Sequence, residues 1–516
     1  MIKKMKECNK IMLLIFFTFV FAFILYYKHW TFELPLHPNI DEKTTINAVR
    51  SMLSSDSYTY SAFNYPHLTF YYGMFWYKLV SAFCTISDLT LFLRAVICGF
   101  ALISNICIYF AVKRLTGSRK WGYIGLLISI FSLYQMEYLY YSGPDTMLYG
   151  CANVVILLGI IIFKEEDSKK SLYKWYPLIA IWIGLATAAK YHGILLGMYW
   201  LVIHVVKKNH KQLKANLSFI LSCFLIVIAY LVCNISDLLY LKKFISEFFR
   251  NFSHYSGGHI GLEHNFPLIG YLEPFFLYGF GVIGAFLMVL GLVELLKKKE
   301  NRTIGVVLLV MPVLVFIVLC RYKVVLGRNI CLIMPYTYLF LLYGLIALEN
   351  IIKISQKKII VNAVVFVMLL ANVFAICVSE NYDSSYQYAE EYIADNIPSG
   401  SVIYVYGFYV PNIDEEKYTL VTDQIPDHLE ENEYYIDVEY QYDRYIQRKD
   451  YLLFKGEYMY PELAERYYAQ NENFQELVSF RGITMRTGWR YRIGYFDCFK
   501  YKKGDYFIGP TIKIYK

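Results

Sequence analysis

Two adjacent carboxylates, Asp41 and Glu42, are the residues of this sequence best placed to do chemistry. They end its densest polar cluster, residues 37–42, which reads His-Pro-Asn-Ile-Asp-Glu and follows shortly after a long apolar run. Carboxylates take up and release protons, so acid–base chemistry is what such a pair offers. The alternative is an exposed turn, or an N-cap made by Asp41 before a helical pattern over 43–53, because aspartate caps helices well.

A third carboxylate, Asp145, stands in the stretch Ser142-Gly143-Pro144-Asp145-Thr146 between two apolar runs. The proline predicts that a helix begins here, and a carboxylate in the first turn of a helix interacts favourably with the helix dipole. That structural role is one interpretation. The other is that Asp145 faces the same cavity as Asp41.

Lys190 and His192 lie in a second polar stretch, Ala189-Lys190-Tyr191-His192-Gly193, with almost no loop between its flanking apolar runs. A lysine at the end of a membrane span often snorkels to the lipid headgroups. The ammonium can instead hold a phosphate as a point charge. The sequence leaves both interpretations open.

A glycine-rich segment carries His254, His259, Glu263 and His264. The histidines are spaced five and five apart, which matches no metal-binding face of a helix, so we predict no metal site. We expect this segment to form a lid over a substrate. The eleven cysteines show no CxxC pair and most of them stand in apolar runs, where cysteine behaves as a small hydrophobic residue.

The composition shows what must position these residues. Of the 516 residues, 57% are apolar and only 18% are charged, which excludes a disordered chain, a coiled coil and a simple soluble enzyme. Eleven apolar runs in the first 380 residues are long enough to cross a bilayer. They are 11–27, 91–112, 121–141, 146–163, 175–189, 191–206, 214–234, 273–296, 303–320, 329–348 and 358–378.

The aromatic run 66–84 is ambiguous, because it begins at Pro66 and contains Lys78. If it lies along the membrane surface, six short loops rich in Lys and Arg fall on the side of the N-terminus: 1–10, 113–120, 164–174, 207–213, 297–302 and 351–358. The positive-inside rule then places the N-terminus in the cytoplasm and 28–90, 235–272 and the C-terminal residues outside. We therefore predict an interfacial helix for 66–84.

Some cations break that charge trend. Arg321, Arg328 and Arg94 fall on the outer side in this topology. Because they do not serve orientation, they are more informative than the cations of the cytoplasmic loops. We single them out, with Lys190, as candidates for binding an anion.

The C-terminal part, 381–516, differs in kind from residues 1–380. Its formal net charge is −8, against +16 for the rest, so the total of +8 does not point to a nucleic-acid partner. A helical pattern covers 385–396 and another lies near 461–470. Strand-like runs follow at 401–409, 418–422, 434–440 and 509–515, so we expect a small α/β domain outside the membrane.

In the order of these motifs, the chain resembles GT-C-type glycosyltransferases, most closely the bacterial branch of the protein O-mannosyltransferase and aminoarabinose transferase group. The resemblance covers nearly the whole chain. The sequence departs from the family pattern at Asn39 and Ile40. It also departs at Tyr65-Pro66-His67, where a double proline is common. Its motifs are Asp41-Glu42, Tyr65–Leu68, Arg94, Gly143–Thr146, Ala188–Gly193, Ala389–Ile393 and Asn396–Gly400.

The resemblance implies a GT-C-like helical membrane domain, 1–380, and transfer of a sugar from a polyprenyl-phosphate carrier to an acceptor hydroxyl at the outer face. It implies Asp41 as general base in an inverting displacement, Glu42 in support, and Asp145 positioning acceptor or sugar. Lys190, His192, Arg321, Arg328 and Arg94 would bind the donor phosphate, and His67, His254, His259 and Glu263 would serve the acceptor or the lid.

The expected partners are membrane lipid, the lipid-linked donor and a glycan, lipid or protein acceptor, with no nucleic acid and no cofactor. Cations can take the place of a metal at the departing phosphate, so none is required. Two alternatives stay open. One is a polytopic transporter or flippase, although neither repeats nor matched broken helices are visible. The other is a non-catalytic scaffold that displays the acidic C-terminal domain.

Overall fold

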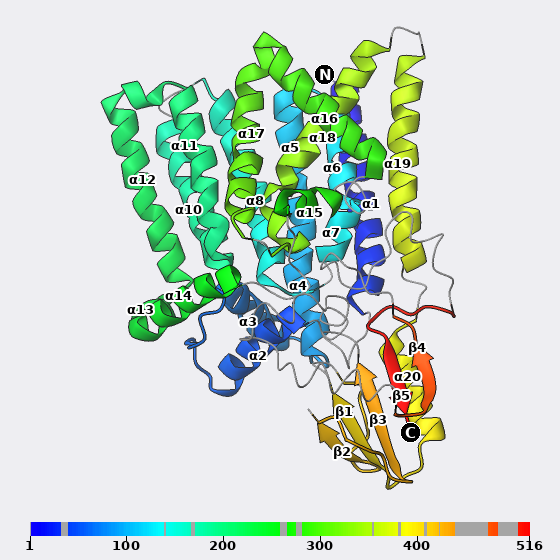
Figure 1. The fold of residues 1–516 in the computed structure, drawn as a ribbon. Coiled ribbons are helices and arrows are strands. Elements are labelled where there is room, and N and C mark those ends of the chain that lie inside the picture. Colours follow the sequence, from blue (N-terminus) through cyan, green and yellow to red (C-terminus); the bar gives the residue numbers. More distant parts are fainter. Residues whose placement is uncertain are drawn as a thin grey trace. The chain divides into compact units, whose positions relative to one another are not determined.

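The computed structural model shows a helical unit and a smaller unit that contains a β-sheet (Figure 1). The first unit comprises Met1–Ser256, Tyr271–Tyr322 and Gly327–Val373; the second comprises Gly257–Gly270, Lys323–Leu326 and Phe374–Lys516. The structure describes residues 2–31, 40–138, 141–166, 171–257, 266–274, 281–322, 324–352, 356–379, 383–406, 410–422, 424–438, 473–482 and 504–516.

Apolar helices make up the first unit. They are α1 (Ile2–Trp30), α2 (Ile40–Ser54), α3 (Leu68–Ser81), α4 (Leu89–Ser104), α5 (Ile106–Thr116), α6 (Arg119–Ile130), α7 (Leu133–Tyr138), α8 (Pro144–Lys164), α10 (Tyr176–Ala189), α11 (Leu196–Val206), α12 (Leu213–Val232), α13 (Ile235–Leu239), α14 (Leu241–Gly257), α15 (Pro267–Pro274), α16 (Gly281–Lys297), α17 (Lys299–Leu319), α18 (Met334–Ile351) and α19 (Lys357–Ser379). Short 3₁₀ or π turns are η1 (Ser171–Trp175), η2 (Tyr191–Leu195), η3 (Asn209–Lys211) and η5 (Gly327–Ile333). Elements α15 and α19 continue into the second unit.

Each of the eleven predicted apolar runs contains helix, but their lengths differ. Within the described residues, seven helical stretches are long and apolar enough to cross a bilayer: Lys10–Trp30, Leu89–Thr116, Pro144–Lys164, Leu213–Val232, Lys299–Leu319, Gly327–Ile351 and Lys358–Val378. The runs at α6–α7, α10, α11 and α16 are helical but shorter than this length. Seven of the eleven predicted spans thus have spanning length within the described residues, and the membrane crossing of the other four stays a prediction.

Local chemistry explains several helix ends. The Asp88 carboxylate accepts hydrogen bonds from the backbone N–H groups of Thr90 and Leu91 and so caps α4. Asn105 interrupts the run between α4 and α5, where its amide donates to the carbonyl oxygens of Ala101 and Leu102. These two residues set where the second apolar run begins and where it bends.

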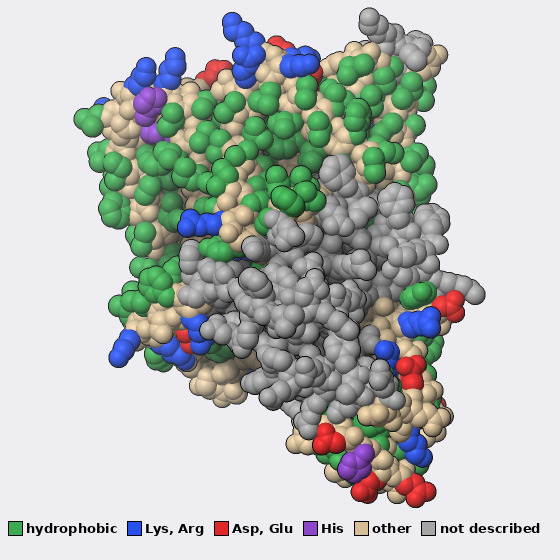
Figure 2. Space-filling view, in the orientation of Figure 1, with side chains coloured by type: hydrophobic (Ala, Val, Ile, Leu, Met, Phe, Trp, Pro, Cys, Tyr) green, Lys and Arg blue, Asp and Glu red, His purple; other side chains and the backbone are tan. Residues whose placement is uncertain are grey.

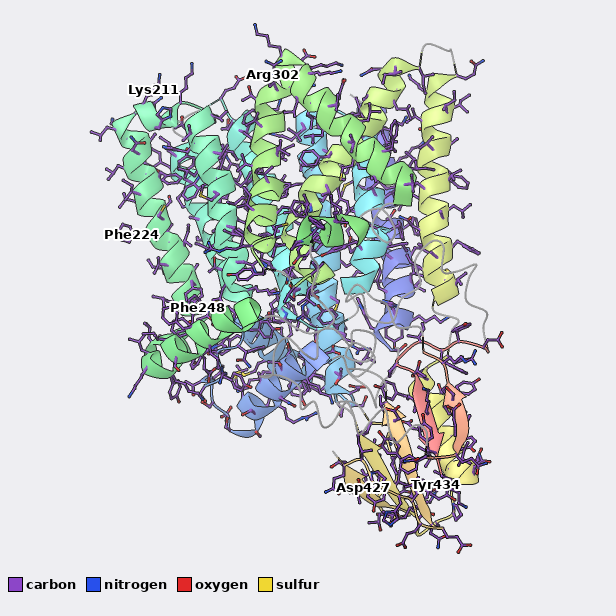
Figure 3. All side chains as sticks on the ribbon, in the orientation of Figure 1. Lys211, Phe224, Phe248, Arg302, Asp427 and Tyr434 are labelled. Carbon is purple, nitrogen blue, oxygen red and sulfur yellow. The ribbon has the colours of Figure 1, made fainter. Side chains whose placement is uncertain are left out.

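Two labelled basic residues mark one end of the helical unit. Lys211 and Arg302 lie at one end, where the N-terminus also lies (Figures 1 and 3). Hydrophobic side chains cover the flank between the ends, as expected for a surface in contact with lipid (Figure 2). Helices α2, α3, α13 and α14 lie at the opposite end, which we call the site end (Figure 1). Helix α3 covers most of the ambiguous run 66–84, in agreement with the predicted interfacial helix.

The second unit contains a five-stranded sheet of order β2-β1-β3-β5-β4. Strands β1, β2 and β3 are parallel, whereas β5 is antiparallel to both β3 and β4. The strands are β1 (Val402–Tyr406), β2 (Thr419–Thr422), β3 (Glu433–Val438), β4 (Glu476–Phe480) and β5 (Ile512–Tyr515).

The predicted helix over 385–396 is confirmed as α20 (Ser385–Asn396), which the Ser384 hydroxyl caps. The four predicted strands correspond to β1, β2, β3 and β5, and the small α/β fold is confirmed. Strand β4 was not predicted, and the helix expected near 461–470 lies outside the described residues.

Helices α16 and α18 approach each other closely through two glycines. A Cβ atom at Gly291 would lie 1.8 Å from the carbonyl oxygen of Phe340, and one at Gly344 would lie 1.8 Å from that of Leu287. Backbone atoms cannot move aside as a flexible side chain can. The close packing of α16 against α18 therefore requires glycine at both positions.

We expect Gly344→Ala to destabilise the protein by about 1–3 kcal/mol, the usual range for overpacking. Thermal unfolding of the purified protein in detergent measures this change. Gly197→Ala is the matched control, because nothing lies within 4 Å of a Cβ there and alanine favours a helix. Equal melting temperatures for the two variants would contradict the close helix contact.

Candidate active site

Asp41 and Glu42 stand in the first turn of α2, which begins at Ile40. The helical pattern predicted over 43–53 therefore starts three residues earlier than expected. Asp41 lies inside the helix, so the N-cap interpretation is wrong. The side chain of Asp41 lies outside the described residues, whereas that of Glu42 is fully buried.

Glu42 forms a buried ion pair with Arg94 of α4. The Arg94 Nε lies 2.9 and 3.1 Å from the two carboxylate oxygens, and Nη2 lies 2.7 Å from Oε2. Arg94 Nη1 also donates to the carbonyl oxygen of Trp30 at 2.7 Å. Ser142 adds two hydrogen bonds to Glu42 Oε1, from its backbone N–H at 2.8 Å and its hydroxyl at 2.9 Å.

This arrangement joins four parts of the chain. Glu42 comes from α2, Arg94 from α4, Trp30 from the end of α1 and Ser142 from the turn before α8. The observed partner of Arg94 is thus a carboxylate, and its predicted role at a phosphate stays a prediction. Both side chains are buried away from water, so each charge is stabilised by its partner instead of by solvent.

A second buried ion pair joins Asp145 to Lys190. The Lys190 Nζ lies 2.6 Å from Asp145 Oδ1, and the side chains are only 4% and 8% exposed. Lys190 therefore points into the protein, and the snorkelling interpretation is wrong. The thiol of Cys331, which belongs to η5, contacts the same Asp145 oxygen at 3.8 Å.

Helix ends position this second pair. Asp145 is in the first turn of α8, with Pro144 opening the helix as predicted. Lys190 terminates α10, and the chain continues into the short turn η2. Two helices that end side by side thus bring a carboxylate and an ammonium together, where the α8 dipole also favours the negative charge.

The two ion pairs are connected through the turn 141–145. Ser142 binds Glu42, and Asp145 follows it by three residues. The turn is held by its own contacts: the carbonyl oxygen of Tyr141 accepts from the Thr146 hydroxyl at 3.0 Å and from the Cys98 thiol at 3.3 Å. The same short turn therefore contributes a residue to each of the two ion pairs.

The remaining predicted cations are more scattered. His192 lies in η2, and its Nε2 is buried without a hydrogen-bond partner among the described residues. Arg328 is half-buried in η5, the element that carries Cys331 to Asp145, whereas Arg321 is exposed beyond α17. Among the described residues, Arg321 makes no contact with either ion pair, so its predicted role at the phosphate stays a prediction.

His67 is fully buried at the start of α3. Its backbone N–H donates to Asn234 Oδ1 at 2.7 Å, and its Nε2 lies 3.0 Å from the carbonyl oxygen of Ala62. Burial lowers the pKa of His67, so the neutral form is favoured. In the structure, the His67 ring packs among aromatic rings. His259, Glu263 and the side chain of His254 lie outside the described residues.

Sequence reasoning missed Asp237, which follows the span α12 in the short helix α13. It is 2% exposed, its Oδ2 accepts a hydrogen bond from the Tyr230 hydroxyl, and burial raises its pKa to about 6. A carboxylate three residues after an apolar run was the available signal. Among the described residues, no group of three or more His, Cys, Asp and Glu side chains is arranged to hold a metal ion.

Comparisons with known proteins agree with this architecture. Residues 73–233 match the sequence model of the family described as dolichyl-phosphate-mannose-protein mannosyltransferase. The matched segment runs from α3 to the end of α12 and contains Arg94, Asp145 and Lys190. No curated protein sequence matches the chain.

Several solved structures are similar in fold. ArnT from Cupriavidus metallidurans bound to undecaprenyl phosphate matches with a TM-score of 0.53 at 12% identity, over 85% of this chain and 94% of that one. The Archaeoglobus fulgidus oligosaccharyltransferase AglB in complex with an inhibitory peptide and a dolichol-phosphate matches with a TM-score of 0.52 at 10% identity, over 81% and 68%. The apo form of the A. fulgidus oligosaccharyltransferase gives 0.51 at 9% identity, over 75% and 62%. The chain is thus a helical membrane protein with the GT-C glycosyltransferase fold, and its segment 73–233 is similar to the dolichyl-phosphate-mannose-protein mannosyltransferases.

Proposed function

We propose that this protein is a membrane glycosyltransferase that moves a sugar from a polyprenyl-phosphate carrier to an acceptor hydroxyl at the outer face of the membrane. The proposal rests on two buried ion pairs, Glu42–Arg94 and Asp145–Lys190, which one short turn connects. Ionisable residues buried in a membrane domain are costly and usually serve a function. The family match, and the lipid phosphates bound by ArnT and AglB, support this substrate class.

The chemistry is a single displacement with inversion. The acceptor oxygen forms a bond to the anomeric carbon while the bond between that carbon and the phosphate oxygen breaks. The acceptor proton passes to the Asp41 carboxylate, and the electron pair of the broken bond leaves with the polyprenyl phosphate. Asp41 is the first charged residue after the start of α2, adjacent in the chain to the anchored Glu42.

Glu42 and Arg94 then act as positioning residues. The Arg94 guanidinium and the two donors of Ser142 engage both carboxylate oxygens of Glu42. Its role is to fix the first turn of α2 against α4 and the turn 141–145, and with it the backbone that carries Asp41.

Lys190 supplies positive charge toward the departing phosphate. The Lys190 ammonium is held 2.6 Å from Asp145 Oδ1, and an ammonium can bind a phosphate as a point charge. The neighbouring His192 offers a buried ring nitrogen that has no partner among the described residues. Asp145 holds Lys190 at the meeting point of α8 and α10, and so prepares the cation before the donor arrives.

The charge distribution supports an orientation in which the site end faces outward. The N-terminus, Lys211 and Arg302 share the opposite end, which the positive-inside rule would place in the cytoplasm (Figure 3). A lipid-borne donor suits such a site because nucleotide sugars are not present outside the cell. The sheet-containing C-terminal part would then be exoplasmic.

Asp41→Asn should lower sugar transfer by at least about a hundredfold, because loss of a general base costs 10²–10⁴ in rate. The assay follows labelled sugar from polyprenyl-phosphate donors into product in isolated membranes. Asp56→Asn is the matched control, since this exposed aspartate pairs only with Lys78 among the described residues and should leave the rate unchanged. Near-normal turnover by Asp41→Asn in correctly inserted protein would rule out the assignment.

Glu42→Gln should destabilise the protein by about 3–5 kcal/mol, because it leaves the buried Arg94 charge uncompensated. Adding Arg94→Met to this variant should recover part of the loss in melting temperature, since no unpaired charge remains. Asp56→Asn breaks an exposed pair and should cost about 1 kcal/mol or less. If Glu42→Gln melts like Asp56→Asn, the ion pair does not hold the first turn of α2.

Lys190→Gln should weaken binding of polyprenyl phosphate by about tenfold or more, because a charge-assisted hydrogen bond contributes about 1.5–3 kcal/mol. Binding of the lipid to purified protein measures this without requiring turnover. The KM for the acceptor should change much less, and Lys78→Gln provides the exposed control. A larger effect on the acceptor than on the lipid would assign Lys190 to the acceptor instead.

A further inference from the structure

Helix α14 lies at the site end of the helical unit, after α12 and the short α13 (Figure 1). Because an α-helix turns by about 100° per residue, residues four apart share a face. On this basis the described side chains of α14 divide into three stripes. Each stripe has its own composition and its own surroundings.

The first stripe faces the protein and contains Phe244, Glu247 and Phe248. The ring of Phe244 lies 5.7 Å from that of Phe63, and the ring of Phe248 lies 5.2 Å from that of Tyr191. Glu247 Oε2 accepts a hydrogen bond from the backbone N–H of Phe63 at 2.7 Å. The single carboxylate of the helix is thus used internally, and its side chain is only 14% exposed.

The second stripe is apolar and exposed. Leu241, Ile245 and Phe249 follow each other at intervals of four and are 49%, 44% and 64% exposed. Exposed apolar residues continue this surface along α13 and α12. They are Leu239, Leu238, Ile235, Val232, Ile228 and Phe224. Phe224 lies on the outward flank of α12, which is the lipid-facing surface of the bundle (Figure 3).

The third stripe is polar and basic, with Lys242, Lys243, Ser246 and Arg250. Lys243 lies 3.9 Å from Glu247, and Arg250 Nη2 lies 3.4 Å from Asn64 Oδ1, so both retain donors for other groups. All four residues are exposed. This positive charge is at the end opposite Lys211 and Arg302, so it does not belong to the basic loops that orient the chain.

We propose that α14 docks on anionic phospholipid headgroups of the leaflet at the site end of its own membrane. The apolar stripe enters the boundary of the acyl chains, because it continues the lipid-facing surface of α12. The basic stripe then lies at the level of the phosphates, where each Lys or Arg interacts favourably with an anionic surface. Zwitterionic lipid satisfies the apolar stripe but leaves the basic one without a partner of opposite charge.

Docking of α14 also reaches the candidate active site. Phe63 is held from two sides: Glu247 of α14 accepts from its N–H, and its carbonyl oxygen accepts from the Tyr191 hydroxyl at 3.0 Å. Tyr191 directly follows Lys190 in the chain. Anionic lipid therefore orders α14, the segment around Phe63 and the neighbourhood of Lys190 together. This last step rests on the proposed function and predicts faster sugar transfer in anionic membranes.

Hydrogen–deuterium exchange of the full chain in nanodiscs tests the docking without requiring turnover. We compare phosphatidylcholine alone with phosphatidylcholine containing phosphatidylglycerol. The amides of α14 should exchange about fivefold more slowly or better with phosphatidylglycerol, because one basic residue at an anionic surface corresponds to a factor of about five. The triple variant Lys242→Gln, Lys243→Gln and Arg250→Gln should lose this response.

The matched control replaces three exposed lysines by glutamine: Lys211 at the opposite end, Lys214 in the first turn of α12 and Lys120 in the first turn of α6. It should respond like the unmodified protein. Equal exchange in both lipids, or a full response from the α14 variant, would overturn the proposal. A dimer in detergent that Ile245→Ser disrupts, with exchange independent of lipid, would identify a second copy as the occupant. Lipid-dependent exchange without sugar transfer would refute the proposed function and leave the docking intact.

Discussion

The buried ion pair between Glu42 and Arg94 is the interaction on which the site end depends. Taking two charges out of water is costly, and only good geometry with further hydrogen bonds offsets that cost. Both conditions hold, since the guanidinium contacts both carboxylate oxygens and Ser142 adds two donors. A buried ion pair adds little to the free energy of unfolding compared with apolar side chains in the same place. However, few other arrangements of the surrounding helices would satisfy both charges. The pair therefore fixes how α1, α2 and α4 pack against the turn before α8. It also fixes the position of the first turn of α2.

The second ion pair shows how a membrane bundle places charge without exposing it to lipid. Asp145 and Lys190 are next to each other because α8 begins where α10 ends, and because η2 and η5 interrupt the regular helices there. Irregular backbone within a membrane bundle is tolerated where it is buried in protein. The break between α10 and α11 therefore places the ammonium of Lys190 beside Asp145.

The sequence predicted those features that depend on local pattern. Apolar runs indicated the membrane helices, Pro144 indicated the start of α8, and the helical pattern over 385–396 indicated α20. What could not be predicted depends on contacts between distant residues. Glu42 and Arg94 are 52 positions apart, and Asp145 and Lys190 are 45 apart, so neither pairing is visible in spacing. Strand β4 was missed because its hydrogen bonds come from β5, far along the chain, and an irregularity between Glu476 and Val478 disturbs its alternation.

Charge serves different physical purposes at the two ends of the helical unit. At the end with Lys211 and Arg302 the cations lie at or beside the connections between helices, in η3 and in the first turn of α17. This is sufficient for orientation, because the positive-inside rule counts charges and ignores their geometry. On α14 the cations instead occupy one stripe beside an apolar one, while the only acidic residue of the described stripes is turned inward. Orientation does not require such regularity, but contact with a charged planar surface does. The same helix holds Phe63 and, through Tyr191, the chain next to Lys190. In the proposed docking, the membrane surface therefore contributes to positioning the buried cation.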